Sequence, residues 1–203
     1  MKIAFYGSSL LSSYWNGAAT YYRGILSALA GCGYEITFYE PDAFDRQQRR
    51  DIDPPEWARS VVYQADEASL RRVLAEAGNA DVVIKASGVG VFDRELLQGI
   101  VAHARPGALK AFWDVDAAAT LDEMRQAPDH PVCQALPQLD LVLTYGGGPP
   151  VIDAYRAFGA RRCVPIYNAL DPATHHPVAA DRAFACDLAF LANRLPDREA
   201  RVE

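Results

Sequence analysis

The chain has 203 residues, of which 50% are hydrophobic and 23% charged, and its formal net charge is −6. This composition is typical of a globular protein with a substantial core and excludes wholesale disorder. The negative charge argues against a nonspecific nucleic-acid binder, which would present a basic face. The densest basic cluster, Arg46, Arg49 and Arg50, lies among aspartates and is interpreted as a solvated loop. We therefore expect no nucleic-acid partner.

No stretch approaches the ~20 apolar residues of a membrane helix, and the N-terminus lacks the charged and apolar regions of a signal peptide. We therefore expect a cytoplasmic protein without a transmembrane segment. The cysteines include no C-x-x-C pair, which argues against both a zinc site and a disulfide framework. They are Cys32, Cys133, Cys163 and Cys186.

The chain opens with a predicted strand, loop, helix and strand. The apolar run from Ile3 to Tyr6 is typical of a strand covered on both faces of a parallel sheet. A Ser-rich loop leads to Asn16, a good N-cap residue, and the helix that follows ends at Gly31. Residues 35–39 are the second predicted strand. A helix N-terminus at the carboxyl edge of such a sheet suits an anionic or polyhydroxylated ligand.

The glycine spacing in this unit disfavours an NAD-dependent oxidoreductase. The dinucleotide fingerprint G-x-G-x-x-G must follow the strand directly, whereas a long loop separates Gly7 from Gly17. Glu40, at the end of the second predicted strand, stands where an acid would bind a ribose. A lone acid after a strand is common by chance, so Glu40 does not restore the NAD interpretation.

Strands and helices alternate along the rest of the chain after a long polar excursion over residues 40–57. Apolar runs predict strands at residues 60–63, 81–86, 108–113, 139–144 and 162–167. Helical stripes predict helices at residues 67–77, 92–104, 117–126 and 151–158. The segment with Pro128, His130 and Pro131 is interpreted as a loop. This alternation predicts an α/β fold, a Rossmann-like doubly wound parallel sheet with helices on both faces.

The pattern changes near Asn168. Residues 1–168 are predicted to form the Rossmann-like domain, and the turn-rich, polar residues 169–184 are interpreted as a linker. Residues 185–203 are interpreted as the beginning of a second domain, with a strand at residues 187–191 and the first turns of a helix from Asp197. Because that domain is only begun, we expect the chain to be a truncated or fragmentary one.

Ligands of doubly wound sheets bind outside the carboxyl ends of the strands. Asn16, Ser87, Asp114 and Thr144 follow predicted strands and are expected around one crevice there. Asp114 and Asp116 flank one residue, so in an extended segment both carboxylates point the same way and one is a candidate general base. The alternative is that one of them caps the following helix.

Three further features have a functional and a structural interpretation. The triple glycine that begins at Gly146 either lets the backbone approach a ligand or forms only a tight turn. His175 and His176 are adjacent, and adjacent side chains of an extended segment point in opposite directions, so a solvated pair is favoured over a metal site. Trp15 stands in the first loop, where it is a candidate for stacking on a sugar ring, although tryptophans are more often core residues.

Residues 166–172, I-Y-N-A-L-D-P, resemble the I-P-N-G-V-D segment that closes the N-terminal domain of GT-B glycosyltransferases, with Tyr167 and Ala169 departing from that pattern. Residues 16–18 and 33–37 resemble the G-G loop and the G-H-E-V strand of the same fold, with Asn16 in place of the first glycine. Other segments look most like the CgeB-type (spore maturation protein-like) glycosyltransferases: residues 38–42, 85–88, 112–116, 145–148 and 191–194.

The resemblance covers essentially the whole chain and implies two Rossmann-like domains, with acceptor recognition mostly in the N-terminal one. The acceptor would be a small molecule or a glycan, and a nucleotide sugar would bind as co-substrate through a second domain, without a cofactor or a metal in the chemical step. Asp114 is the expected catalytic residue. The expected substrate-binding residues are Asn16, Gly17, Ser87, Gly88, Asp116, Thr144, Tyr145, Gly146, Asn168 and Asp171. The alternative is a non-catalytic ligand-binding or interaction module with the same fold.

Overall fold

The computed structural model describes residues 1–169, 171–172 and 175–189. The chain divides into two compact units, residues 1–172 and residues 173–203. In the described part of the second unit, the 3₁₀ helix η3 (Arg182–Phe184) begins after Asp181, whose side chain accepts a hydrogen bond from the Ala183 amide at 2.9 Å. Of the predicted strand at residues 187–191, residues 187–189 are described and lie in no strand, and the other two fall outside the described residues. The predicted helix from Asp197 lies wholly outside them. The predicted linker and second domain therefore stay predictions.

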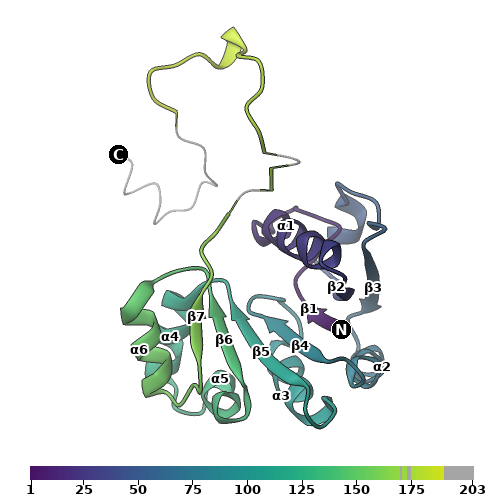
Figure 1. Ribbon diagram of the computed structural model, residues 1–203, viewed down its shortest axis with the longest axis vertical. Helices are drawn as coiled ribbons and strands as arrows, with labels where there is room; N and C mark the ends of the chain where they lie inside the picture. The colour runs from purple at the N-terminus through teal and green to yellow at the C-terminus, as the bar shows by residue number, and fades with distance from the viewer. Residues whose placement is uncertain (170, 173–174, 190–203) are drawn as a thin grey trace. The chain divides into compact units, whose positions relative to one another are not determined.

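A seven-stranded, wholly parallel sheet forms the first unit (Figure 1). Its order is β3-β2-β1-β4-β5-β6-β7. The strands are β1 (Lys2–Tyr6), β2 (Glu35–Asp42), β3 (Ala58–Gln64), β4 (Val82–Ala86), β5 (Leu109–Asp114), β6 (Leu141–Thr144) and β7 (Cys163–Pro165). The strand order reverses direction between β1 and β4, which is where doubly wound folds bind their ligands.

Helices cover both faces of this sheet. The helix α1 (Ala18–Gly31) packs on one face through Tyr21, Tyr22 and Leu26. Five helices pack on the other face and share a second core. They are α2 (Glu67–Ala77), α3 (Asp93–His103), α4 (Ala117–Gln126), α5 (Pro131–Ala135) and α6 (Gly148–Ala157). The predicted Rossmann-like doubly wound α/β fold is thus confirmed.

Successive side chains of each central strand pack alternately into the two cores. Phe5 of β1 stacks on Phe38 of β2 on the α1 face, with ring centroids 5.2 Å apart. Tyr6, the next residue, stacks on Tyr39 on the opposite face at 4.9 Å. The parallel register pairs these residues directly. Burial on both faces explains why these strands appear in the sequence as unbroken apolar runs.

One local prediction was wrong, and one predicted strand was too long. The segment interpreted as a loop contains α5 and the 3₁₀ helix η2 (Leu136–Gln138). Pro131 occupies the first helical turn, where a missing N–H costs little, and His130 precedes it with a ring nitrogen 3.4 Å from the Val132 amide. The last strand, β7, is shorter than the predicted residues 162–167, although the Ile166 amide still donates a hydrogen bond to the Thr144 carbonyl oxygen of β6 at 2.6 Å.

Candidate functional site

Strained backbone gathers in the loops that follow the strands. Among the described residues, four other than glycine have positive φ angles: Trp15 (48°), Phe44 (58°), Asp45 (56°) and Phe92 (55°). They lie in the loops after β1, β2 and β4, at the carboxyl edge of the sheet. Such conformations cost about 1–3 kcal/mol each and tend to cluster at functional sites. The strained loops therefore mark the carboxyl edge of the sheet as the candidate site.

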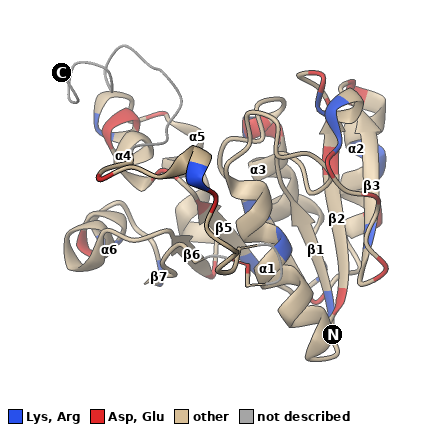
Figure 2. Ribbon diagram, turned by 90° about the horizontal axis from the view of Figure 1, so that it is seen from above, with Lys and Arg blue, Asp and Glu red and all other residues tan. Residues whose placement is uncertain are grey.

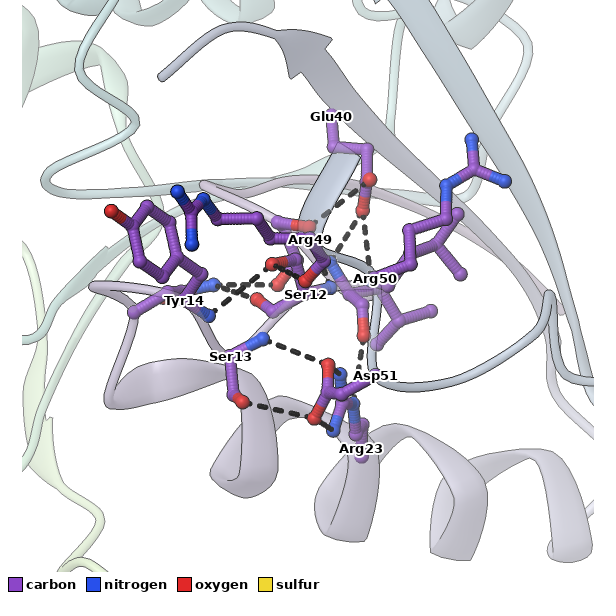
Figure 3. Close-up of polar contacts among 12 residues, drawn as sticks. Ser12, Ser13, Tyr14, Arg23, Glu40, Arg49, Arg50 and Asp51 are labelled. Carbon is purple, nitrogen blue, oxygen red and sulfur yellow. Dashed lines mark hydrogen bonds and ion pairs between the residues drawn. The ribbon is translucent and has the colours of Figure 1, made fainter. Parts of the chain in front are cut away.

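Glu40 holds the loop after β1 in place (Figure 3). Its carboxylate is fully buried and accepts hydrogen bonds from the Leu10 amide, the Leu11 amide (3.2 Å) and the Ser9 hydroxyl (3.1 Å). Gln47 of the 3₁₀ helix η1 (Arg46–Arg49) donates a further hydrogen bond at 2.6 Å. A carboxylate committed to these protein groups has no capacity left for a ribose, which adds a structural argument against NAD binding.

A second anchor of the same loop is Asp51 (Figure 3). The Arg23 guanidinium of α1 donates two hydrogen bonds to the two carboxylate oxygens of Asp51, at 2.8 and 2.9 Å. Ser13 donates from its amide and its hydroxyl to the same carboxylate, both at 2.9 Å. These hydrogen bonds, first those of Arg23 and then those of Ser13, hold the pKa of Asp51 well below its ordinary value. The first loop is consequently a fixed part of the edge.

Asn16 belongs to this internal scaffold and is not the helix cap that we predicted. The N-cap position of α1 is Gly17, which has no side chain to supply a cap. The Asn16 side chain is buried, accepts a hydrogen bond from the Ser8 hydroxyl at 2.8 Å, and donates to the Ser9 and Ser12 carbonyl oxygens at 2.8 and 3.1 Å. Its amide is fully used within the loop, so the assignment of Asn16 to substrate binding is not supported.

The interpretation of Arg46 as a solvated residue was also wrong. Its side chain is buried and donates hydrogen bonds from Nη1 to the carbonyl oxygens of Ser8 (3.2 Å) and Val89 (3.3 Å). Its guanidinium also lies over the Phe44 ring, 5.0 Å from the centroid. Burial lowers the pKa of Arg46, and the nearby Glu40 opposes this shift. Arg46 thus ties together the loops after β1, β2 and β4.

Asp114, the expected catalytic residue, is a buried hub. Its exposed fraction is 0%, and one oxygen accepts hydrogen bonds from Ser87 Oγ, Thr120 Oγ1 and the Asp116 amide, each at 3.0 Å. The other oxygen accepts from the Tyr155 hydroxyl of α6. All four donors belong to the protein, and the side chain has no exposed surface with which to contact an acceptor. This arrangement does not support direct contact between Asp114 and a substrate.

A hollow of about 500 Å³ opens beside this hub, between the beginnings of α3, α4 and α5. Three expected substrate-binding residues line it, namely Ser87, Gly88 and Asp116. Asp116 is solvent-exposed at the N-cap position of α4, but its side chain makes no capping hydrogen bond. No group in the described part of the chain donates a hydrogen bond to its carboxylate. The other lining residues are Lys85, Asp93, Arg94, Leu97, Phe112, Val115, Ala119, Thr120, Glu123, His130, Pro131 and Val132.

Lys85 is a feature of the hollow that the sequence analysis missed as a site residue. It lies on β4 with 3% of its surface exposed and forms an ion pair with Asp93 at the start of α3. Asp93 also accepts hydrogen bonds from the amides of Val89 (3.2 Å) and Gly90 (2.8 Å). Burial lowers the pKa of Lys85, while Asp93 opposes the shift. A lysine inside an otherwise apolar strand was the signal that could have found it.

The remaining expected residues lie elsewhere. Thr144 is buried and its hydroxyl donates to the Gly146 carbonyl oxygen at 3.0 Å, while Tyr145 packs edge-on against Tyr21 with ring centroids 4.5 Å apart. Asn168 is exposed beyond β7. Asp171 lines a separate groove of about 400 Å³ along α1. The predicted single crevice is therefore wrong in detail, because Ser87 alone of Asn16, Ser87, Asp114 and Thr144 lines the hollow.

The described residues contain no group of three or more His, Cys, Asp and Glu side chains arranged to hold a metal ion. None of their helices is both long enough and apolar enough to cross a membrane.

Solved structures of glycosyltransferases share this fold. The structure of UDP-glucose: anthocyanidin 3-O-glucosyltransferase in complex with UDP matches over 90% of this chain and 56% of its own, with a TM-score of 0.57 and 10% identity. An alpha-glucosyltransferase in complex with UDP-glucose and DNA containing an abasic site matches over 81% of this chain and 42% of its own, with a TM-score of 0.55 and 12% identity. At such identities the likeness shows the GT-B type of Rossmann-like fold.

The chain spans about half the length of these neighbours. No protein-family model and no curated protein matches the sequence. The resemblance to CgeB-type proteins therefore stays a prediction.

Proposed function

We propose that this chain is the acceptor-side lobe of a glycosyltransferase that moves a sugar from a nucleotide sugar to an acceptor held in the hollow. The observation that carries the proposal is the combination of a GT-B type fold with a hollow at the carboxyl edge whose rim presents the free carboxylate of Asp116. Pockets of a few hundred Å³ with an apolar lining and a few convergent polar groups are typical of small-molecule sites.

Asp116 takes the chemical role that the sequence had suggested for Asp114. An exposed carboxylate without a competing donor can accept the proton of an acceptor hydroxyl, or orient that hydroxyl for attack on the sugar. Asp114 is a positioning residue, because its carboxylate accepts the Asp116 amide hydrogen and so fixes the backbone that carries Asp116. Ser87 supports the same turn by accepting the Val115 amide hydrogen at 2.8 Å.

The donor would bind through a second domain, because the part that this chain matches makes up only 42% and 56% of the two neighbours. One lobe supplies only part of the positioning and electrostatic stabilisation of a transfer reaction. Residues 1–203 alone are therefore expected to bind acceptor without transferring sugar. We propose a cytoplasmic location and a reaction without a metal, as the family resemblance implied.

The acceptor is proposed to be a small molecule or a glycan. The DNA in the alpha-glucosyltransferase complex belongs to that protein. In this chain the net charge is −6, and Figure 2 shows basic and acidic residues interspersed over the described elements. An interspersed, net negative surface does not provide the continuous basic face that a phosphate backbone requires.

The test uses a protein that carries this chain together with a nucleotide-sugar-binding domain. Asp116→Asn should lower kcat by about 10²-fold if the carboxylate acts as a base. The matched control is Asp122→Asn on the same helix, because Asp122 is exposed, pairs with Arg125 and lies outside the hollow. An unchanged kcat in Asp116→Asn would contradict its role. Absence of transfer from every nucleotide sugar by the wild-type protein would favour the non-catalytic ligand-binding module.

A further inference from the structure

The buried ammonium of Lys85 has more donor capacity than the protein uses. An ammonium carries three N–H donors. One is committed to Asp93, and within the described residues no other group accepts a hydrogen bond from it. The Phe112 ring lies beside the ammonium, with its centroid 5.6 Å away. A buried donor without a partner is costly, so two free donors in the wall of a hollow indicate that a ligand atom completes them.

The rest of the hollow has two chemically distinct parts. Its apolar part includes Leu97, Phe112, Val115 and Val132. Its polar part includes hydrogen-bond donors, from Lys85 and Arg94, and hydrogen-bond acceptors, the carboxylates of Asp93, Asp116 and Glu123. A ligand that fits must therefore combine an apolar surface with groups that both donate and accept hydrogen bonds.

We propose that the hollow binds a neutral, polyhydroxylated ring, a hexopyranoside, as the acceptor or as the acceptor's terminal unit. This inference rests on the proposed function and names the substrate class of the same site. Ring hydroxyl oxygens accept the free N–H donors of Lys85, another hydroxyl donates to the Asp116 carboxylate, and the C–H face of the ring lies on the apolar side chains. Lys85 is thus a specificity-determining residue that contacts the acceptor.

The charge balance favours a neutral ring over a charged one. The ammonium of Lys85 is already neutralised by Asp93, and Glu123 lies 3.4 Å from the His130 ring. With Lys85 and Arg94 against the carboxylates of Asp93, Asp116 and Glu123, the lining has one more carboxylate than it has cations, so a carboxylate or a phosphate on the ligand would enter a site that is already net negative. An ammonium on the ligand would in turn lie beside Lys85, whose donors it cannot accept. Hydroxyl groups satisfy both sides because they donate and accept.

Binding can be measured on residues 1–203 without any sugar donor. Methyl hexopyranosides, the matching uronic acids and the matching 2-amino-2-deoxy glycosides are titrated while ¹H–¹⁵N spectra are recorded. We expect the neutral glycosides to bind with a Kd on the order of 1 mM, as suits so small a ligand, and to shift the amide signals of Gly88, Asp116 and Glu123. The uronic acids and amino sugars should bind at least about 10-fold more weakly.

Lys85→Met should weaken binding of the neutral glycosides by about 10-fold or more, because hydrogen bonds from the charged group are lost. The matched control is Lys110→Met on the neighbouring strand, outside the hollow, where an affinity change of less than about 2-fold is expected. If Lys85→Met unfolds, the Lys85→Met/Asp93→Asn double variant removes both charges together and should show the same loss of affinity.

Tighter binding of a charged sugar than of its neutral counterpart would overturn the proposal, as would unchanged affinity in the folded Lys85 variants. These failures are separable from a failure of the proposed function. A longer protein that transfers sugar only to a charged acceptor would keep the function and refute the substrate class. Neutral-glycoside binding that depends on Lys85, in a longer protein without transferase activity, would support the site and refute the function.

Discussion

The anchoring of the first loop by Asp51 can be tested by Asp51→Asn, which keeps the shape of the side chain and removes its charge. The Asp51 carboxylate accepts four hydrogen bonds, two from the Arg23 guanidinium and two from Ser13. Hydrogen bonds to charged groups contribute about 1.5–3 kcal/mol when buried. The Asp51 side chain is 42% exposed, so solvent screening lowers the expected loss for the whole set to about 1–2 kcal/mol.

The assay is thermal and denaturant unfolding of wild type and Asp51→Asn at pH 7, with Asp53→Asn as control. Asp53 is exposed and only two residues away. In a chain of this size each kcal/mol lowers Tm by about 2–4 °C. Asp51→Asn should therefore be measurably less stable, the Ser13 amide should exchange its hydrogen faster, and Asp53→Asn should match wild type.

The difference should also depend on pH. Because the folded pKa of Asp51 is lowered, its carboxylate stabilises the fold fully above the unfolded value of about 3.9 and progressively less as pH falls below it towards the folded pKa. The stability gap between wild type and Asp51→Asn should thus be constant from pH 7 to about pH 5 and narrow towards pH 3. An equal stability of the two proteins at pH 7, or a gap that does not narrow in acid, would refute the anchoring role.

Two further predictions concern the same edge of the sheet. Trp15→Gly should raise the free energy of unfolding, measured in denaturant titrations, by about 1 kcal/mol. Trp15 has a φ of 48° and is 67% exposed, so glycine relieves the backbone strain with little loss of packing. A lower stability of the variant would show that Trp15 supports the fold. Arg46→Met should lower the free energy of unfolding by about 2 kcal/mol, because the Ser8 and Val89 carbonyl oxygens lose a buried charged donor. An unchanged free energy of unfolding would mean that Arg46 does not tie the loops together.

Residue patterns predicted most of the fold because the spacing of apolar residues along the chain shows which side chains are buried. Alternating sides of Ile3–Tyr6 contact the two cores, and the stripe Leu70, Val73, Leu74 and Ala77 faces the sheet from α2, which spans the predicted residues. Prediction from local residue patterns failed where contacts between distant parts of the chain determine the structure. Pattern alone could not show that α5 would form after Pro131 within a segment rich in turn residues.

The site was predicted less accurately than the fold. A position at the end of a strand shows where a residue lies, but it does not determine the direction in which the side chain points. Asp114 and Asp116 were expected to point the same way, but Thr120 and the distant Tyr155 complete a buried cage around Asp114 alone. Asn16 is likewise held by loop carbonyl oxygens. Lys85 shows the opposite case, since its position within an apolar strand was visible and its ion pair with Asp93 was not.

Asp116 is proposed to act on an acceptor in the hollow, and the most direct test is the kcat of Asp116→Asn in a protein that carries this chain together with a nucleotide-sugar-binding domain. It should be measured at saturating nucleotide sugar and saturating acceptor, beside wild type and Asp122→Asn. We predict a kcat about 10²-fold below wild type for Asp116→Asn, with an unchanged melting temperature and a wild-type kcat for Asp122→Asn. A kcat within about 2-fold of wild type in a folded Asp116→Asn protein would contradict the claim.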